Sequence, residues 1–279
     1  MQQPRNETPD GEEPDLPPDE EEEVQEREAA SSRVIHEVIR RQGDEELDRP
    51  ASSLFFSGVV AGVAMAASVL GRGLIESHLP DTEWRLPVAS IGYCLGFVIV
   101  VLGRLQLFTE STLSAVIPVA ASPSVRNFVR LGRLWGLVLA ANLVGTLLIA
   151  WLATEGWVGT QASTKAMLDT SRSLLELSGW DAVRAAVPAG FLMAGIAWSL
   201  PGARRQEFFV LVFCTYFISL GEFAHVVAGA VEAWMLWLAG EASLGWVLGG
   251  FLAPALLGNI LGGSVLFALL AHAQVREET

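Results

Sequence analysis

Charged residues are scarce in this chain of 279 residues: Asp, Glu, Lys and Arg make up 18% of it, against about 25% in an ordinary soluble domain. The scarcity is greater in the body of the chain, because residues 1–30 hold twelve of the 31 acidic residues and only two basic ones. Twelve negative and two positive charges give that segment −10 of the total net charge of −13. The rest is nearly neutral, so the basic surface typical of nucleic-acid binding is not expected.

Cysteine and histidine are also rare, with two Cys and four His in the whole chain. Cys94 and Cys214 both stand inside apolar segments, so we expect two small buried residues rather than a disulfide framework. The scattered histidines offer no zinc spacing, and no phosphate-binding loop or nucleophile–base motif is present. We therefore expect no metal, no cofactor and no enzymatic activity. The acidic N-terminus also lacks the pattern of a secretory signal.

The N-terminal part divides at about residue 32. Residues 1–31 are rich in Pro and Glu and predict a disordered acidic tail. Residues 32–49 place an apolar stripe, from Val34 to Ile39, among arginines. This pattern predicts an amphipathic helix, lying either on the membrane surface or against the protein, that ends before Pro50.

Long apolar runs fill the remainder, residues 50–276, which we expect to form a transmembrane transporter domain. A spanning helix needs roughly 20 apolar residues. The predicted passes are 51–76, 86–121, 127–153, 182–200, 207–238 and 244–271. The second is interrupted at 103–110 and the fifth at 219–225. The fold class is therefore all-α integral membrane, with six transmembrane helices of which helices 2 and 5 are broken.

Basic residues predict the orientation of these passes. They gather before the first pass, at the start of the third, between the fourth and fifth, and after the sixth. These are Arg33, Arg40, Arg41, Arg49, Arg126, Arg130, Arg133, Arg204, Arg205 and Arg276. We expect a multi-pass protein of the inner (plasma) membrane with both termini in the cytoplasm.

The two halves, about residues 50–155 and 180–276, resemble each other. AGVAMAASVLG in the first pass matches AGIAWSLPG in the fourth, and Asn142 in the third matches Asn259 in the sixth. Thr109 lies 33 residues before Asn142, and His225 lies 34 residues before Asn259. Three passes per half predict an inverted repeat, with a site at the bilayer midplane. Chance similarity of Ala- and Gly-rich helices is the alternative.

Each interruption carries a polar candidate. Thr109 can donate a hydrogen bond into a cavity, cap the short helix that follows, or do both. His225 is an ionisable residue inside a span, and such residues are usually functional. Because the pKa of a histidine in water is about 6.5, His225 can share a proton with a weak-acid anion. The alternative is a neutral structural histidine.

Charged residues flank both interruptions. Arg104 and Glu110 stand in the first and Glu222 in the second. Because a buried charge needs a partner, we expect Arg104 to pair with Glu222 or Glu110, or to attract an anion. Alternatively, Arg104 extends into a water-filled vestibule.

Three segments resemble the formate/nitrite transporter family, and within it the YfdC-type branch: QLFTESTLSAVIPV from Gln106, GEFAHVVAGAVE from Gly221 and GNILGGSVLFALLAHAQ from Gly258. The resemblance covers about residues 34–276. It implies an aquaporin-like inverted repeat, a homopentamer with one pore per protomer, and passage of small monovalent anions or their protonated acids, such as formate and nitrite.

The resemblance also implies roles for single residues. Thr109 matches the family's threonine in the first break and His225 its central histidine. The path residues that this implies are His225, Thr109, Leu107, Phe108 and, at the hydrophobic constrictions, Tyr93, Phe97 and Ile218.

Other positions depart from the family pattern. Arg104 and Gln106 replace a glycine and an acidic residue. Ser173 and Gly190 stand where a vestibule lysine and a pore-facing asparagine are expected.

From these observations we expect a pore for small anions or weak acids in the lipid bilayer, with proton sharing at His225. Two alternatives remain. One is a channel for a neutral solute, such as water or glycerol. The other is a non-transporting membrane scaffold whose acidic tail binds a partner.

Overall fold

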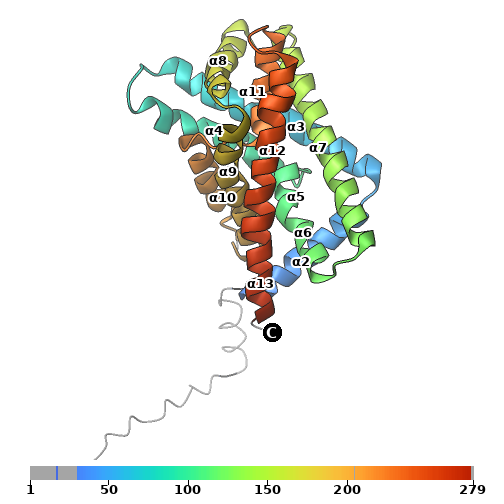
Figure 1. Cartoon of the computed structure of the whole chain (residues 1–279). Coiled ribbons are helices and arrows are strands. Elements are labelled where there is room, and N and C mark those ends of the chain that lie inside the picture. Colours follow the sequence, from blue (N-terminus) through green and yellow to red (C-terminus); the bar gives the residue numbers. More distant parts are fainter. Residues whose placement is uncertain (1–16, 18–29, 204, 278–279) are drawn as a thin grey trace, which may run out of the picture.

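The computed structural model describes residues 17, 30–203 and 205–277, and these residues are helical without any strand (Figure 1). Nearly all of the acidic tail expected at 1–31, and Arg204, lie outside the described residues.

Five helices are long and apolar enough to cross a membrane. They are α3 (Ala51–His78), α4 (Arg85–Leu102), α7 (Val125–Thr154), α9 with η2 (Gly179–Gly202) and the continuous η3–α12–η4–α13 helix (Trp246–Glu277). Shorter apolar helices are α5 with α6 (Phe108–Ala121), α10 (Glu207–Leu220) and α11 (Val226–Leu238).

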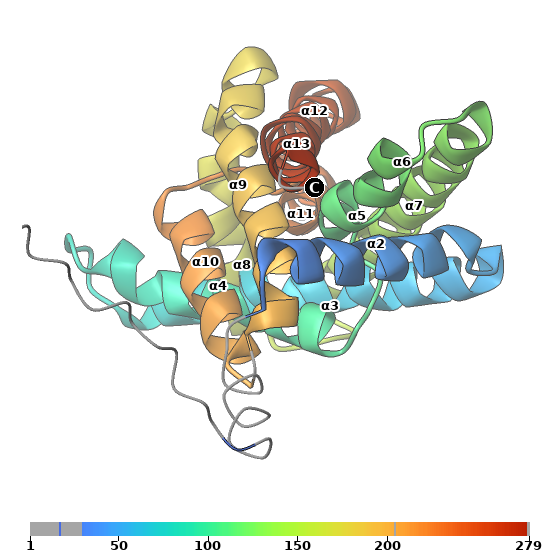
Figure 2. The same cartoon turned by 90° about the horizontal axis from the view of Figure 1, so that it is seen from below.

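The amphipathic helix α2 (Ser32–Asp48) matches the predicted range of 32–49 closely. The Ser31 hydroxyl caps it by accepting from the backbone N–H of Val34. Its buried residues recur every three or four positions: His36, Ile39, Gly43 and Leu47. This stripe turns one face toward the short helices α5 and α6, and the helix lies across the end of the molecule that holds the C-terminus (Figure 2).

Two of the glycines show how closely the long helices pack. A side chain at Gly62 of α3 would overlap the backbone carbonyl of Asn142 in α7. A side chain at Gly190 of α9 would overlap the carbonyl of Asn259 in α12. The absence of a pore-facing asparagine at residue 190 thus has a steric reason, because this position faces a neighbouring backbone.

The two short helices begin where longer ones have just ended. α4 ends at Leu102 and α5 (Phe108–Ser114) follows, so the first break comprises residues 103–107. α10 ends at Leu220 and α11 follows, so the second break comprises residues 221–225. The first interruption was expected to reach Glu110. In the structure, Thr109 and Glu110 belong instead to the first turn of α5.

The end of the molecule opposite α2 is formed by the connection between α7 and α9. It contains α8 (Gln161–Ser171) and the short 3-10 helix η1 (Arg172–Glu176). Between the two ends, the outer faces of α3, α7 and α10 expose large apolar side chains, among them Phe56, Val129, Phe209 and Phe213. Such a surface is suited to lipid or to neighbouring protein copies.

Candidate functional site

The two breaks have the same backbone conformation. Arg104 and Glu222 adopt left-handed φ values of 52° and 51°. Leu107 and His225, the residues that precede α5 and α11, have φ/ψ of −109°/126° and −107°/120°. In both breaks, a backbone N–H bonds to a carbonyl five residues earlier: Leu105 to Val100 and Phe223 to Ile218, each at 2.9 Å.

Asn142 holds the first break in place from α7. Its side-chain oxygen accepts from the backbone N–H of Phe108 at 2.9 Å. Its amide donates to the carbonyls of Gly58 and Gln106, at 2.8 and 2.9 Å. Asn142 is fully buried, so it satisfies backbone groups of the break that water cannot reach.

Asn259 holds the second break in the same way from α12. Its oxygen accepts from Val226 N–H at 2.8 Å, and its amide donates to the carbonyls of Ala186 and Ala224, at 2.8 and 3.0 Å. Each asparagine therefore joins its own long helix to a second long helix, to the break itself and to the first residue of the short helix that follows.

These bonds set the correspondence between the breaks. Phe108 corresponds to Val226, and Leu107 corresponds to His225. The sequence spacing had paired Thr109 with His225, and this register is wrong by two residues. The error arises because the pairing aligned two polar residues, whereas the asparagines bind backbone groups whatever the side chain.

Thr109 and His225 nevertheless meet. Thr109 Oγ1 lies 2.7 Å from His225 Nε2, and both residues are at most 1% exposed. His225 Nδ1 accepts from the backbone N–H of Ala228 at 3.1 Å. A neutral ring that accepts at Nδ1 carries its hydrogen on Nε2 and donates it to Thr109. His225 thus caps α11 and binds the first turn of α5.

Of the apolar residues expected along the path, some lie beside His225 and others do not. The Phe97 ring stands edge-on to the His225 ring, with 5.0 Å between the ring centroids. It also contacts the Tyr93 ring, with 5.3 Å between centroids. Tyr93 and Ile218 line a cavity together with His225. Phe108 instead packs its ring on Trp135 of α7 at 5.7 Å.

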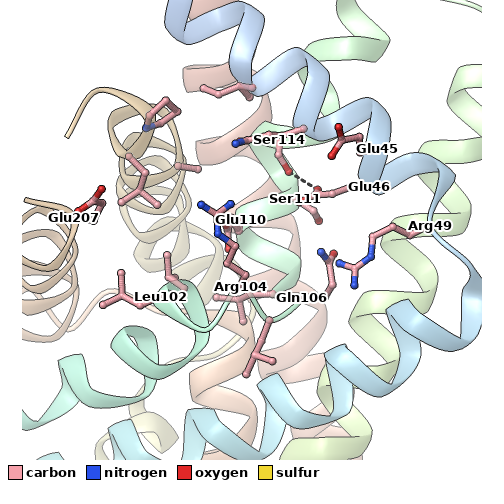
Figure 3. Close-up of a pocket in the computed structure, with 18 residues that line it drawn as sticks. Glu45, Glu46, Arg49, Leu102, Arg104, Gln106, Glu110, Ser111, Ser114 and Glu207 are labelled. Carbon is pink, nitrogen blue, oxygen red and sulfur yellow. Dashed lines mark hydrogen bonds between the residues drawn. The ribbon is translucent and has the colours of Figure 1, made fainter. Parts of the chain in front are cut away.

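One cavity of about 520 Å³, the α2 cavity, opens between α2, the first break and the beginning of α10 (Figure 3). Its lining includes Leu107, Arg104 and Glu110. Glu46 of α2 accepts a 2.7 Å hydrogen bond from the Ser114 hydroxyl there. Burial raises the pKa of Glu46 above its usual value.

α2 is also joined to the C-terminal helix α13 (Leu269–Glu277). The imidazoles of His36 and His272 stack and share a 2.9 Å hydrogen bond. Burial, and then His272, lower the pKa of His36, and the nearby Glu37 raises it by a smaller amount.

A smaller cavity of about 120 Å³, the η1 cavity, lies toward the opposite end. Arg72 of α3 lines it and is only 9% exposed. Its guanidinium lies 3.0 Å from Glu76 and 3.9 Å from Glu222. The predicted Arg104–Glu222 pair is therefore not formed, because Arg104 lines the α2 cavity, whereas Glu222 lines the η1 cavity. Arg104 has no carboxylate within 4 Å among the described residues, Glu110 included.

The sequence reasoning overlooked Arg72, Glu76 and Glu232, three ionisable residues of α3 and α11, of which Arg72 and Glu232 are buried. The signal was available, because each is an ionisable residue inside an apolar helix, as His225 is. Ser219 was also overlooked, and no sequence pattern separates it from an ordinary helix serine. No group of three or more candidate metal ligands occurs in the part of the chain that the structure describes.

Long apolar helices that enclose a buried polar pair between two helix breaks are typical of polytopic membrane proteins with a solute path. The chain belongs to the formate/nitrite transporter family, whose model, described as "Formate/nitrite transporter", matches residues 33–273.

Individual relatives agree with this assignment. The chain is 36% identical over 247 residues to the "Inner membrane protein YfdC" of Escherichia coli (strain K12), covering 88% of this chain and 79% of that protein. It is 26% identical over 245 residues to the "Uncharacterized transporter YrhG" of Bacillus subtilis (strain 168), covering 85% and 90%. A solved structure titled "Pentameric formate channel with formate bound" shares the fold, with a TM-score of 0.70 at 18% identity over 82% of this chain and 98% of that one.

Proposed function

We propose that the protein transports small monovalent anions, or their protonated weak acids, through a path in each protomer. The observation that carries the proposal is the buried Thr109–His225 pair between two polar cavities, in a chain of this family. Formate and nitrite are the first substrates to test, because the family's name gives them and the structural neighbour is a formate channel.

We further propose an aquaporin-like inverted repeat of six passes. On this view α4 with α5–α6 forms the second pass, and α10 with α11 forms the fifth. The equivalent hydrogen bonds of Asn142 and Asn259 support the repeat. A transporter domain at 50–276 would follow the amphipathic helix and the acidic tail.

The proposed setting is the inner membrane, with the α2 cavity and both termini in the cytoplasm. Arginines near α2 and at the start of α7 support this orientation. The "Inner membrane protein" in the name of the E. coli relative supports the location, and the pentameric neighbour supports a homopentamer.

The barrier to an anion lies between the cavities. Desolvating an ion costs several kcal/mol even after the protein relaxes. Fully buried Phe97 and Ile218 offer no polar group there. Proton sharing near His225 would lower this barrier by making the permeating species a neutral acid.

The hydrogen bonds of His225 restrict how it shares a proton. A second ring proton would occupy Nδ1 and displace the Ala228 N–H. It would also place a positive charge at the N-terminus of α11, where the helix dipole disfavours it. The neutral ring can therefore donate its Nε2 hydrogen to a passing anion as a hydrogen bond, and the proton that makes the anion a neutral acid comes from the surrounding solution or from another acidic group.

Proteoliposomes with an imposed pH gradient test the function by uptake of labelled formate and nitrite. We expect uptake to rise as the outside pH falls, because more of the acid is neutral there. His225→Asn keeps an oxygen that caps α11 and removes the ring, so uptake and its pH dependence should both fall. Undiminished, equally pH-dependent uptake in His225→Asn would falsify the role of the histidine.

The alternatives give different outcomes in the same vesicles. A neutral-solute channel would show glycerol or water flux that is insensitive to pH and to His225. A scaffold would show no flux of any solute, whereas a transporter body should keep its flux when residues 1–30 are deleted.

A further inference from the structure

The η1 cavity contains a hydroxyl group with no partner. Ser219 is 2% exposed and lines the cavity, and its Oγ atom has no hydrogen-bond partner among the described residues. An unmade hydrogen bond of a buried group costs about 1–3 kcal/mol. Such a group in a polar cavity is suited to binding a solute that enters the cavity.

The same cavity contains a buried cation. Arg72 is 9% exposed and presents a planar set of donors that matches a carboxylate or a similar oxyanion. Its nearest carboxylate is Glu76, one turn along α3, at 3.0 Å. Glu222 lies farther away, at 3.9 Å, and its side chain is 60% exposed, so its attraction is weakened by solvent. Arg72 therefore keeps capacity for a second anion.

Glu232 on α11 is the third buried group of the cavity, at 8% exposure. It follows His225 by seven residues, which is two helical turns or about 10 Å along the same face. It forms no ion pair within 4 Å in the described part of the chain. Burial favours the neutral form of this carboxyl, because a buried carboxylate without a cation in direct contact is very costly. The ionisable groups around the cavity are Arg72, Glu76, Tyr93, Glu176, Glu222 and His225.

We infer that the η1 cavity is a proton-loading site, in which Ser219 and Arg72 bind a small monocarboxylate or similar oxyanion and Glu232 protonates it. This inference rests on the proposed function and names a proton source other than His225. The O–H bond of Glu232 breaks, the anion gains that proton, and the products are the neutral acid and the Glu232 carboxylate. The released Arg72 then stabilises this carboxylate, so the cavity holds the same net charge before and after. Glu232 recovers a proton from hydronium in the outside solution that reaches the cavity.

Binding of formate and nitrite to the purified protein in detergent tests the first half. Ser219→Ala removes one oxygen and leaves no unpaired atom, so the protein should fold. It should weaken binding of both anions about tenfold or more, since a hydrogen bond to a charged group is lost. The exposed Glu155→Gln at the end of α7 is the control and should bind as the wild type does. Equal affinities of Ser219→Ala and the wild type, or no binding of either anion to the wild type, would overturn the binding site.

Infrared spectroscopy tests the second half without any transport. The wild type at neutral pH should show a carboxylic-acid C=O band that Glu232→Gln loses and Glu155→Gln keeps. In vesicles, Glu232→Gln should flatten the dependence of uptake on outside pH. A carboxylic-acid band that loses no intensity in Glu232→Gln, or an unchanged pH profile of uptake in that variant, would overturn the role of Glu232 while leaving the transport function intact. A wild type that shows the band and binds anions but moves no weak acid would instead overturn the transport function alone.

Discussion

Replacing Asn142 with alanine should destabilise the protein strongly, because one side chain forms three buried hydrogen bonds to two separate segments. Each unpaired buried group costs about 1–3 kcal/mol in soluble proteins. The average measured inside membranes is about 0.6 kcal/mol per bond. Three such bonds give a loss of between about 2 and 9 kcal/mol.

Thermal unfolding of the purified protein measures this loss. For a chain of this size, even the lower bound of about 2 kcal/mol should reduce the melting temperature by about 4–8 °C. Asn259→Ala should show a similar decrease, because it loses the three corresponding bonds. Asn127→Ala is the control, since Asn127 lies on the same helix with an exposed amide. A decrease for Asn142→Ala no larger than that of the control would refute the role of the asparagines.

Three other changes follow from the packing and the buried polar groups. Gly190→Ala should prevent α9 from packing on α12, or lower the yield of folded protein severely, because the added Cβ overlaps the Asn259 carbonyl. Gly132→Ala has open space around the added Cβ and should elute as the wild type does in size-exclusion chromatography. Thr109→Val leaves the hydrogen on the His225 ring unpaired and should reduce formate uptake at least tenfold, while Thr109→Ser should retain most of it. Folding lowers the pKa of His36, so the folded protein binds fewer protons at this residue than the unfolded chain does. The melting temperature should therefore fall as the pH decreases through about 6.5, and His36→Gln should lack this decrease.

Hydropathy alone was enough to predict the long helices, because spans such as α3 and α7 are continuous apolar runs bounded by polar residues. The breaks were also visible, since a charged or glycine residue interrupts each run. The exact limits of the breaks could not be predicted. The start of α5 at Phe108 is fixed by a hydrogen bond that the Phe108 N–H donates to the distant Asn142, and not by a local sequence signal.

The site could be predicted only as far as single residues carry chemistry. Thr109 and His225 were identified as polar residues in apolar surroundings, and the structure brings them within 2.7 Å. The partner of Glu222 was misassigned, because sequence distance does not tell which end of the molecule a side chain faces. The unpartnered hydroxyl of Ser219 follows only from three-dimensional packing.

The left-handed residues at the two breaks also bear on how far the protein could be stabilised. A left-handed conformation costs a residue other than glycine roughly 1–2 kcal/mol, yet the chain has Arg104 and Glu222 there. Glycine at both positions would relieve this cost and remove one charge of each sign from opposite ends of the molecule. The sequence is therefore below its stability optimum at both positions. In a more heat-resistant variant made by these two changes, the α2 cavity would lose a cation from its lining and the η1 cavity would lose an anion, so the gain in stability would change the charge of both cavities.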